Sequence, residues 1–220
     1  MMGQNHIVCT SAMIGSALCV HNSIYNLRFG IVSNFWGLHA SKLDWLQKLD
    51  ETVWQCLGLP DDIKCISALP IIGLFLLIVL FGTLCTDCDK EDSIMGKIIH
   101  VPVEHRTWLH AIWIPALCFF AGLAFKPAAW FALGWFLHEF MDSFSKMGNS
   151  YLYPIVGYHK YGEARVKKGI HNFKLYYAGR QSETIFMLCV VIFCILLSVF
   201  FIRSPYHCID IVGEGFGVLK

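Results

Sequence analysis

The sequence predicts an all-α, polytopic membrane protein. We expect a bundle of four long apolar helices, with a short N-terminal helix and an amphipathic helix on the membrane surface. Of the 220 residues, 56% are hydrophobic and only 15% are charged, whereas a typical soluble domain carries about 25% charged residues. The mean hydropathy is +0.55, and uncharged stretches approach the roughly 20 residues that a helix needs to cross a bilayer. This composition excludes a disordered chain, a collagen-like repeat and a charged coiled coil.

Two uncharged stretches, Ile66–Cys85 and Thr184–Ile202, contain 20 and 19 residues and predict two of the long helices. A third apolar segment, Ile7–Val20, has only 14 residues and is rich in small side chains. That length is short for a membrane span, but small residues favour close packing between helices. We therefore expect a short N-terminal helix packed against the longer ones.

The remaining two long helices are predicted to form a hairpin. Trp108–Phe125 and Ala128–Met141 are almost entirely apolar, and Lys126 and Pro127 separate them. A charged residue followed by a proline is typical of a turn between two helices. The hairpin returns the chain to the membrane face from which it started.

A polar insertion at about residues 21–65 separates the N-terminal helix from the first long one. Within it, Leu38–Cys56 carries apolar residues at spacings of three and four, which indicates an amphipathic helix lying on the membrane surface. We see no internal repeat and no low-complexity tract. Residues 1–220 are therefore predicted to form a single membrane-embedded domain.

Charge predicts the orientation and limits the partners. The loop Ser143–Glu183 contains seven basic residues, whereas residues 21–65 contain four basic and five acidic ones. The positive-inside tendency then places the later loop, and with it residues 86–107, in the cytoplasm. The formal net charge of the whole chain is only +1, so we expect membrane lipids and no nucleic acid among its partners.

Seven side chains of metal-ligand type stand at the ends of the predicted helices. Ionisable residues are costly in or near the bilayer, so each is expected to be paired or to have a function. His138 and Asp142 are four residues apart and share one helix face, so they predict either a shared metal ion or a hydrogen-bonded pair within the helix. His105 and His110 converge only if a helix begins between them, near Thr107. The predicted metal ligands are His6, Asp87, Asp89, His105, His110, His138 and Asp142.

The distance of these residues from the predicted turn, counted along the helices, supports one common site. With a rise of about 1.5 Å per residue, His110 and Asp142 both lie roughly 23 to 25 Å from the predicted turn. Asp87 and Asp89 follow the helix that reaches the same face, and His6 joins them if the first helix starts there. Six or seven nitrogen and oxygen ligands then gather at one membrane face. Glu139 is interpreted as an interior or interfacial polar residue outside this site.

The order of the motifs around these residues resembles the YdjM-like family of membrane-bound metal-dependent hydrolases. The resemblance spans most of the chain apart from the polar insertion. Its motifs are G-x-x-H at Gly3–His6, D-x-D at Asp87–Asp89, H-R-x-x-x-H at His105–His110, G-x-x-x-H-x-x-x-D at Gly134–Asp142, a glycine and a proline at Gly148–Pro154, and G-x-x-x-E at Gly179–Glu183.

The chain also departs from the family pattern at two motifs. Lys90 stands where the family usually has a histidine after the second aspartate. In the segment Thr107–Ala111, the glycine, threonine and serine that usually surround the second histidine are absent. His105, Arg106 and His110 are retained, which keeps the ligand set intact.

The resemblance implies a distant similarity to the all-helical zinc-dependent phospholipases C and single-strand nucleases, and therefore phosphoester hydrolysis. It implies one or two divalent ions, zinc first, with manganese or iron as alternatives, in a bacterial inner membrane protein whose site faces the cytoplasm. A lipid or lipid-linked phosphate is the expected substrate. The expected catalytic residues are Asp89 and Arg106. Asp89 would bridge ions or act as a base, and Arg106 would neutralise a phosphate.

The ligand set alone also fits a membrane protein that binds, senses or transports a metal ion without catalysis. Clustering at one end of the helices favours the hydrolase, because a transporter would need a path of ligands through the bilayer. Paired histidines could instead hold haem, but the accompanying aspartates argue against it, since haem iron takes His, Met or Cys.

Overall fold

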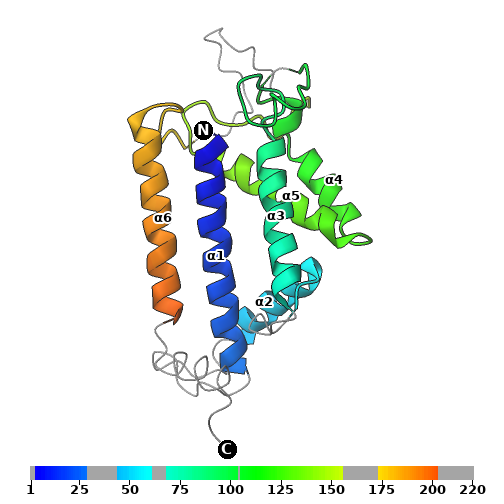
Figure 1. Cartoon of the computed structure of the whole chain (residues 1–220), viewed down its shortest axis with the longest axis vertical. Coiled ribbons are helices and arrows are strands. Elements are labelled where there is room, and N and C mark those ends of the chain that lie inside the picture. Colours follow the sequence, from blue (N-terminus) through cyan, green and yellow to red (C-terminus); the bar gives the residue numbers. More distant parts are fainter. Residues whose placement is uncertain (1–2, 29–43, 61–67, 104, 156–172, 203–220) are drawn as a thin grey trace, which may run out of the picture.

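The computed structural model describes residues 3–28, 44–60, 68–103, 105–155 and 173–202. Within these residues the chain is helical, which confirms the predicted all-α class, and Figure 1 shows the helices as one bundle. The elements are α1 (Gly3–Arg28), α2 (Asp44–Leu57), α3 (Leu69–Cys85), the short 3₁₀ helix η3 (Trp108–His110), α4 (Trp113–Ala121), α5 (Lys126–Ser143) and α6 (Gln181–Ile202).

The prediction of four long apolar helices is wrong. Two helices in the described part of the chain are long and apolar enough to cross a membrane, α1 at Gln4–Ile24 and α6 at Gln181–Val199. Helix α3 is just as apolar but has only 17 residues. At about 1.5 Å per residue it extends roughly 25 Å, slightly less than a hydrocarbon core of about 30 Å.

The N-terminal helix is longer than predicted. Helix α1 has 26 residues and continues to Arg28, so the polar insertion starts after the helix and not at His21. Its polar side chains do not end the helix because neighbouring helices satisfy them. The Asn5 amide donates to Glu183 on α6 (2.6 Å), and the Ser16 hydroxyl donates to the Cys194 carbonyl on α6 (2.8 Å).

The first arm of the hairpin is shorter than predicted. Helix α4 has nine residues, about 13 Å, and the hairpin tip lies only part-way down the bundle in Figure 1. Pro115 explains the late start, because proline has no N–H for a helical bond and is accommodated only in the first turn of a helix. The turn itself lies between Ala121 and Lys126, just before the predicted position. Lys126 and Pro127, predicted to separate the two helices, are instead the first residues of α5, because proline is accommodated in the first turn of a helix.

The amphipathic helix is present as α2, and the residues 38–43 of the predicted range lie outside the described part of the chain. Helix α5 holds its C-terminal end. The Lys126 ammonium donates to the Cys56 carbonyl (3.1 Å), and the Trp130 indole donates to the Leu57 carbonyl (2.6 Å). On the side of α1, the His21 ring stacks on Trp54 with 3.7 Å between ring centroids.

Helices α3 and α5 cross at very short range, through two glycines. A Cβ atom on Gly134 of α5 would lie 1.9 Å from the Val79 carbonyl oxygen, and one on Gly82 of α3 would lie 2.3 Å from the Phe131 carbonyl oxygen. The Thr83 hydroxyl donates across the contact to the Gly134 carbonyl (3.1 Å). Small residues that let two backbones approach are the usual basis of helix packing in membranes.

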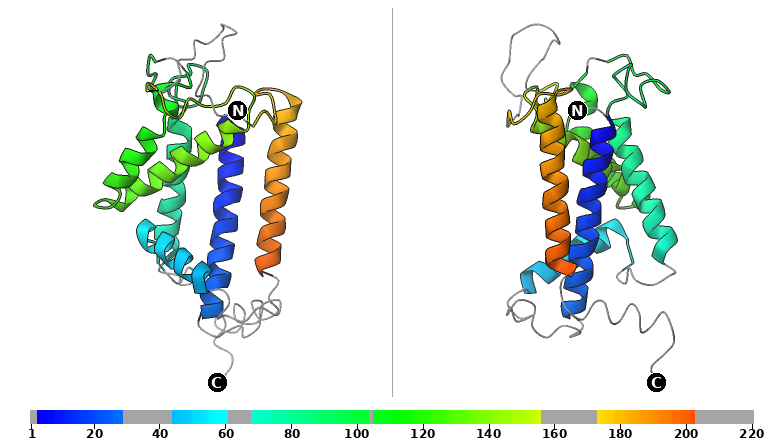
Figure 2. Two further views of the ribbon diagram at one scale, coloured as in Figure 1. Left: turned by 180° about the vertical axis from the view of Figure 1, so that it is seen from behind. Right: turned by 60° about the vertical axis from the view of Figure 1, so that its left-hand side comes forward.

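The bundle brings several helix ends together. Figures 1 and 2 place the N-terminus of α1, the C-terminal end of α3 and the N-terminus of α6 at one end of the molecule. Helix α5 runs obliquely toward the same end, and α2 lies toward the opposite one. The polar residues at these helix ends therefore share one level of the bundle.

The close crossing predicts a stability difference between two glycines. Gly134→Ala should lower the free energy of unfolding by about 1 to 3 kcal/mol, because overpacking forces the two backbones apart. Gly73→Ala, on the partner helix α3, is the matched control, since a Cβ there would meet nothing within 4 Å. Thermal denaturation of both variants in detergent measures the difference, and equal melting temperatures would contradict the prediction.

Candidate metal centre

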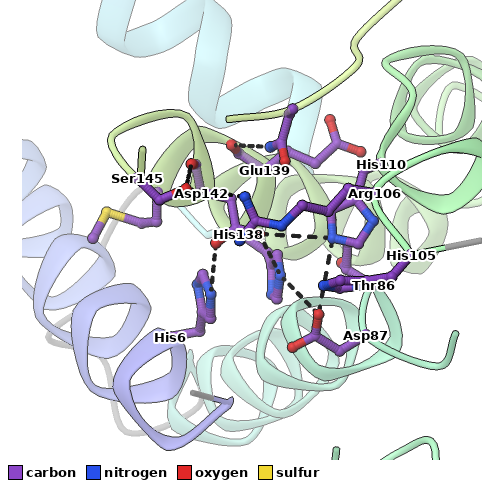
Figure 3. A network of polar contacts seen from close by, with 12 residues as sticks. His6, Thr86, Asp87, His105, Arg106, His110, His138, Glu139, Asp142 and Ser145 are labelled. Atoms are coloured by element: carbon purple, nitrogen blue, oxygen red, sulfur yellow. Dashed lines mark hydrogen bonds and ion pairs between the residues drawn. The ribbon is translucent and has the colours of Figure 1, made fainter. Parts of the chain in front are cut away.

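All seven predicted ligands lie around one point at the shared end of the bundle. They come from four places in the chain: α1, the segment after α3, the segment that ends in η3, and the last two turns of α5. Figure 3 labels all of them except Asp89. The 3₁₀ helix begins directly after Thr107, which confirms that a helix starts between His105 and His110. Six of the seven side chains are buried, and only His105 is partly exposed.

Asp142 lies at the centre of the group. Its Oδ1 is 3.3 Å from Nε2 of His6, and its Oδ2 is 3.7 Å from Nε2 of both His110 and His138. The predicted depth of His110 rests on a continuous helix back from the turn, which does not form. His110 nevertheless reaches Asp142, because the backbone of Ala111 between η3 and α4 is extended (φ −91°, ψ 136°) and covers more distance per residue than a helix.

Asp87 faces Asp142 across the two histidines. Its Oδ1 lies 3.5 Å from Nε2 of His138 and 3.8 Å from Nε2 of His110. The two imidazole nitrogens are thus each within 4 Å of two carboxylates from different elements. His6 stacks on His138 with 3.7 Å between ring centroids, which completes the group on the side of α1.

Asp89 holds two histidines in place. The His105 Nδ1–H donates to Oδ1 of Asp89 (2.8 Å), and Oδ2 of Asp89 lies 3.7 Å from Nδ1 of His110. In metal sites, a carboxylate at one ring nitrogen fixes the tautomer and leaves the other nitrogen for the metal. This geometry gives Asp89 an orienting position beside the ligands.

The backbone fixes His138 in the same way. Its Nδ1–H donates to the Thr83 carbonyl (2.8 Å), in the last turn of α3. The lone pair on Nε2 therefore faces Asp87 and Asp142. The close crossing of α3 and α5 is what brings this carbonyl to the imidazole, because Gly134 lies one turn before His138.

The donor atoms fit a metal ion. Several buried atoms have no hydrogen-bond partner, and a buried polar group without a partner is strongly unfavourable. These atoms are both ring nitrogens of His6 and His110, Nε2 of His138 and Oδ2 of Asp89. Two sets have ligand atoms within 4.8 Å of one another: His6, His138 and Asp142 in one, and Asp87, His105 and His110 in the other.

The charge of the site also matches a cation. Asp87, Asp89 and Asp142 bring three negative charges, and Arg106 brings one positive charge. Burial lowers the pKa of His110 well below its ordinary value of 6.5, with the charge of nearby His105 adding to the effect, so His110 is neutral at pH 7. A neutral imidazole is the form that binds a metal.

The Arg106 guanidinium forms hydrogen bonds and an ion pair within the protein. Its Nη1 donates to the Ser145 hydroxyl (2.9 Å) and the Gly148 carbonyl (2.7 Å), and its Nη2 lies 3.3 Å from Oδ2 of Asp142. The backbone of Arg106 has φ +65°, a conformation that is strained for any residue except glycine and clusters at functional sites. The guanidinium thus fixes Asp142 and the chain after α5, and its Nε has no partner.

Glu139 lies closer to the candidate ligands than predicted. Complete burial confirms that it is an interior residue, but it lies beside His138 and neither carboxylate oxygen has a hydrogen-bond partner. A carboxylate inside an otherwise apolar helix is itself the signal that could identify it. The Thr83 carbonyl, which orients His138, could not be predicted, because a backbone carbonyl leaves no signal in the pattern of side chains.

The closing motif G-x-x-x-E joins α6 to the same end of the bundle. The Glu183 carboxylate accepts hydrogen bonds from the Asn5 amide and from the backbone N–H of Gly179, which has φ +73°. Positive φ favours glycine at this position. Glu183 therefore fixes α6 against the first turn of α1, directly before His6.

Comparison with known proteins identifies the family. No curated protein and no solved structure matches the chain. A family model described as YdjM inner membrane protein matches residues 63–206, more than half of the chain. The match covers every residue of the centre except His6 on α1. The resemblance of the motifs is thereby confirmed, and the protein belongs to the YdjM inner membrane protein family.

Proposed function

We propose that this protein is a membrane-bound, metal-dependent hydrolase that cleaves a phosphoester of a lipid or lipid-linked phosphate at the cytoplasmic face of the inner membrane. The observation that carries the proposal is the convergence of four histidines and three aspartates at one point. Within this group, buried ring nitrogens of His6, His110 and His138 have no hydrogen-bond partner. Mixed imidazole and carboxylate ligands suit zinc, and also manganese or iron.

The two ligand sets assign the residues. His6, His138 and Asp142 would hold one divalent ion, and Asp87, His105 and His110 a second one. Asp89 would orient His105 and His110 from behind, as the carboxylates beside ligating histidines do in other metal sites. With a single ion bound, the second set would remain available to a substrate.

The chemistry follows from the ligand set. A bound divalent ion would act as a Lewis acid on phosphoryl oxygens and lower the pKa of water. Arg106 keeps Asp142 in position and holds its own positive charge at the site, where it would offset the charge of a phosphate. The partly exposed His105 marks the open side of the centre, through which water and a substrate would enter.

The position of the centre supports a lipid substrate. It lies at the ends of apolar helices, and a ligand at that level meets the headgroup region of a bilayer. Trp108 is 49% exposed directly beside the ligand segment, and tryptophan is enriched at membrane interfaces. A metal transporter would need further ligands deeper in the bundle, whereas all the ligands proposed here lie at one end.

The first prediction from this proposal concerns the loss of one metal ligand. His138→Ala should abolish both metal retention and hydrolysis of a phosphodiester substrate, because it removes the Nε2 donor that faces Asp87 and Asp142. His100→Ala is the matched control, since His100 is exposed. Metal analysis by mass spectrometry and a phosphodiester panel with zinc, manganese or iron measure the two effects. Full metal content in His138→Ala would refute the proposal.

A second prediction concerns metal removal. A chelator should lower the melting temperature of the protein, because the buried aspartates then repel one another without a compensating cation. His138→Ala should melt at a lower temperature and respond much less to the chelator. If the chelator shifts both proteins equally, the stabilising metal lies elsewhere.

A third prediction tests the orientation. Lys174→Cys and Lys48→Cys both place a thiol at an exposed position, at opposite ends of the bundle. On intact spheroplasts, an impermeant maleimide should label the thiol at position 48, whereas the thiol at 174 should react only after permeabilisation. Labelling in the opposite order would overturn the cytoplasmic orientation of the site.

A further inference from the structure

The segment that follows α3 forms a compact loop, which is fixed to the turn that carries Asp87. Within residues 86–103, the Ser93 hydroxyl donates to the Asp87 carbonyl (2.7 Å) and accepts a hydrogen bond from the Gly96 N–H (2.8 Å). The loop folds back so closely that a Cβ atom on Gly96 would lie 2.0 Å from the carbonyl oxygen of Lys90. Its conformation is therefore set by packing and hydrogen bonds, and it is held against the ligand segment.

The apolar side chains at the tip of this loop have two different environments. Met95 is buried and belongs to an apolar cluster that includes Trp135 of α5, with Ile114 of α4 packed against it. Ile98 and Ile99 are instead 71% and 57% exposed. Their backbone N–H groups both donate to the Met95 carbonyl (2.9 and 2.7 Å), so the two exposed isoleucines directly adjoin the anchored residue. Adjacent exposed apolar side chains on a fixed loop, unlike single ones, indicate a contact surface.

The loop stands where the boundary of the membrane is expected. Figure 2 shows it directly past the end of α3. Helix α3 has 17 residues and extends about 25 Å, whereas the hydrocarbon core of a bilayer is about 30 Å thick. In a member of an inner membrane protein family, residues just past the end of this helix are therefore still within reach of the acyl chains.

Exposed aromatic residues mark the same boundary. Phe81, one turn before the end of α3, is 50% exposed, and Trp113 at the start of α4 is 41% exposed. Trp108, in the 3₁₀ helix η3, is 49% exposed. Tryptophan is enriched at membrane–water interfaces. Ile114 follows Trp113 in the chain and packs on the cluster that contains Met95, so the tip of the loop adjoins these aromatic residues.

The charged side chains of the loop are compatible with an interfacial position. The Glu91 side chain is 87% exposed, and its Oε1 lies 3.8 Å from Nε2 of His100. The Asp92 side chain is 76% exposed, and its Oδ1 lies 3.5 Å from Nζ of Lys90. Lys97 is also exposed, and a lysine can bury its methylene chain while its ammonium stays in water. A hydrated polar edge beside an apolar edge is typical of segments that lie in the membrane interface.

We propose that Ile98 and Ile99 insert into the lipid leaflet at the end of the bundle that carries the metal centre, where acyl chains cover them. The hydrophobic effect favours this position, because the two side chains leave water without any change in the fold. Through Ser93, the inserted loop holds the segment with Asp87 at headgroup level. Insertion requires neither a bound metal nor hydrolysis, so it does not depend on the proposed function.

The test places an environment-sensitive fluorescent amino acid at position 98 of the full-length protein, in nanodiscs of phosphatidylcholine and phosphatidylglycerol that each hold a single copy. The emission should shift to the blue relative to that of the free amino acid in water. It should be quenched when the same lipids carry bromine on their acyl chains, because bromine quenches on contact. Position 92 in the same loop is the matched control, since the Asp92 side chain is 76% exposed. The emission there should stay water-like and unquenched.

Water-like emission at position 98 would overturn the proposal, because the isoleucines would then lie in solvent. A blue shift without quenching by bromine would refute lipid insertion as well, since protein would cover them. Equal quenching at positions 98 and 92 would contradict the separation of an apolar edge from a polar one. Both labelled proteins should keep the melting temperature of the wild type, because each probe replaces an exposed side chain. If the probe at position 98 lowers it, position 99 provides the same test.

Discussion

The close crossing of α3 and α5 is the constraint on which the site depends. Gly82 and Gly134 let the two backbones touch, and this contact brings the last turn of α3 within reach of the last turns of α5. The Thr83 carbonyl can then orient His138, and Asp87 can face Asp142. A side chain in place of either glycine would separate the two halves of the centre, although neither glycine carries any chemistry itself.

Helix α1 connects the rest of the bundle to this pair through polar contacts inside an apolar protein. Asn5 and Ser16 bind α6, His6 approaches α5, and Thr10 lies 3.5 Å from the Thr83 hydroxyl of α3. At its far end, His21 pairs with Asp50 of α2 (2.8 Å). Hydrogen bonds between membrane helices are individually worth about 1 kcal/mol, but they fix the register of the helices along one another.

The candidate ligands could be predicted from sequence because each stands at a helix end, where its type and spacing are conspicuous. Helical periodicity is enough to predict that His138 and Asp142 share one helix face. A helix start near Thr107 is enough to predict that His105 and His110 converge. The extent of α1 could not be predicted, because His6 and His21 look like helix-ending residues until their partners on other helices are known. The short α4 could have been predicted from Pro115. The carbonyl of Thr83 that orients His138 could not have been predicted, because every residue has a backbone carbonyl.

Helix α5 joins two distant parts of the molecule. Its last turns carry His138 and Asp142, whereas its first turns hold the C-terminal end of α2 through Lys126 and Trp130. An α-helix of 18 residues is a stiff rod of about 27 Å. The same stiff element therefore positions both the candidate ligands His138 and Asp142 and the C-terminal end of α2.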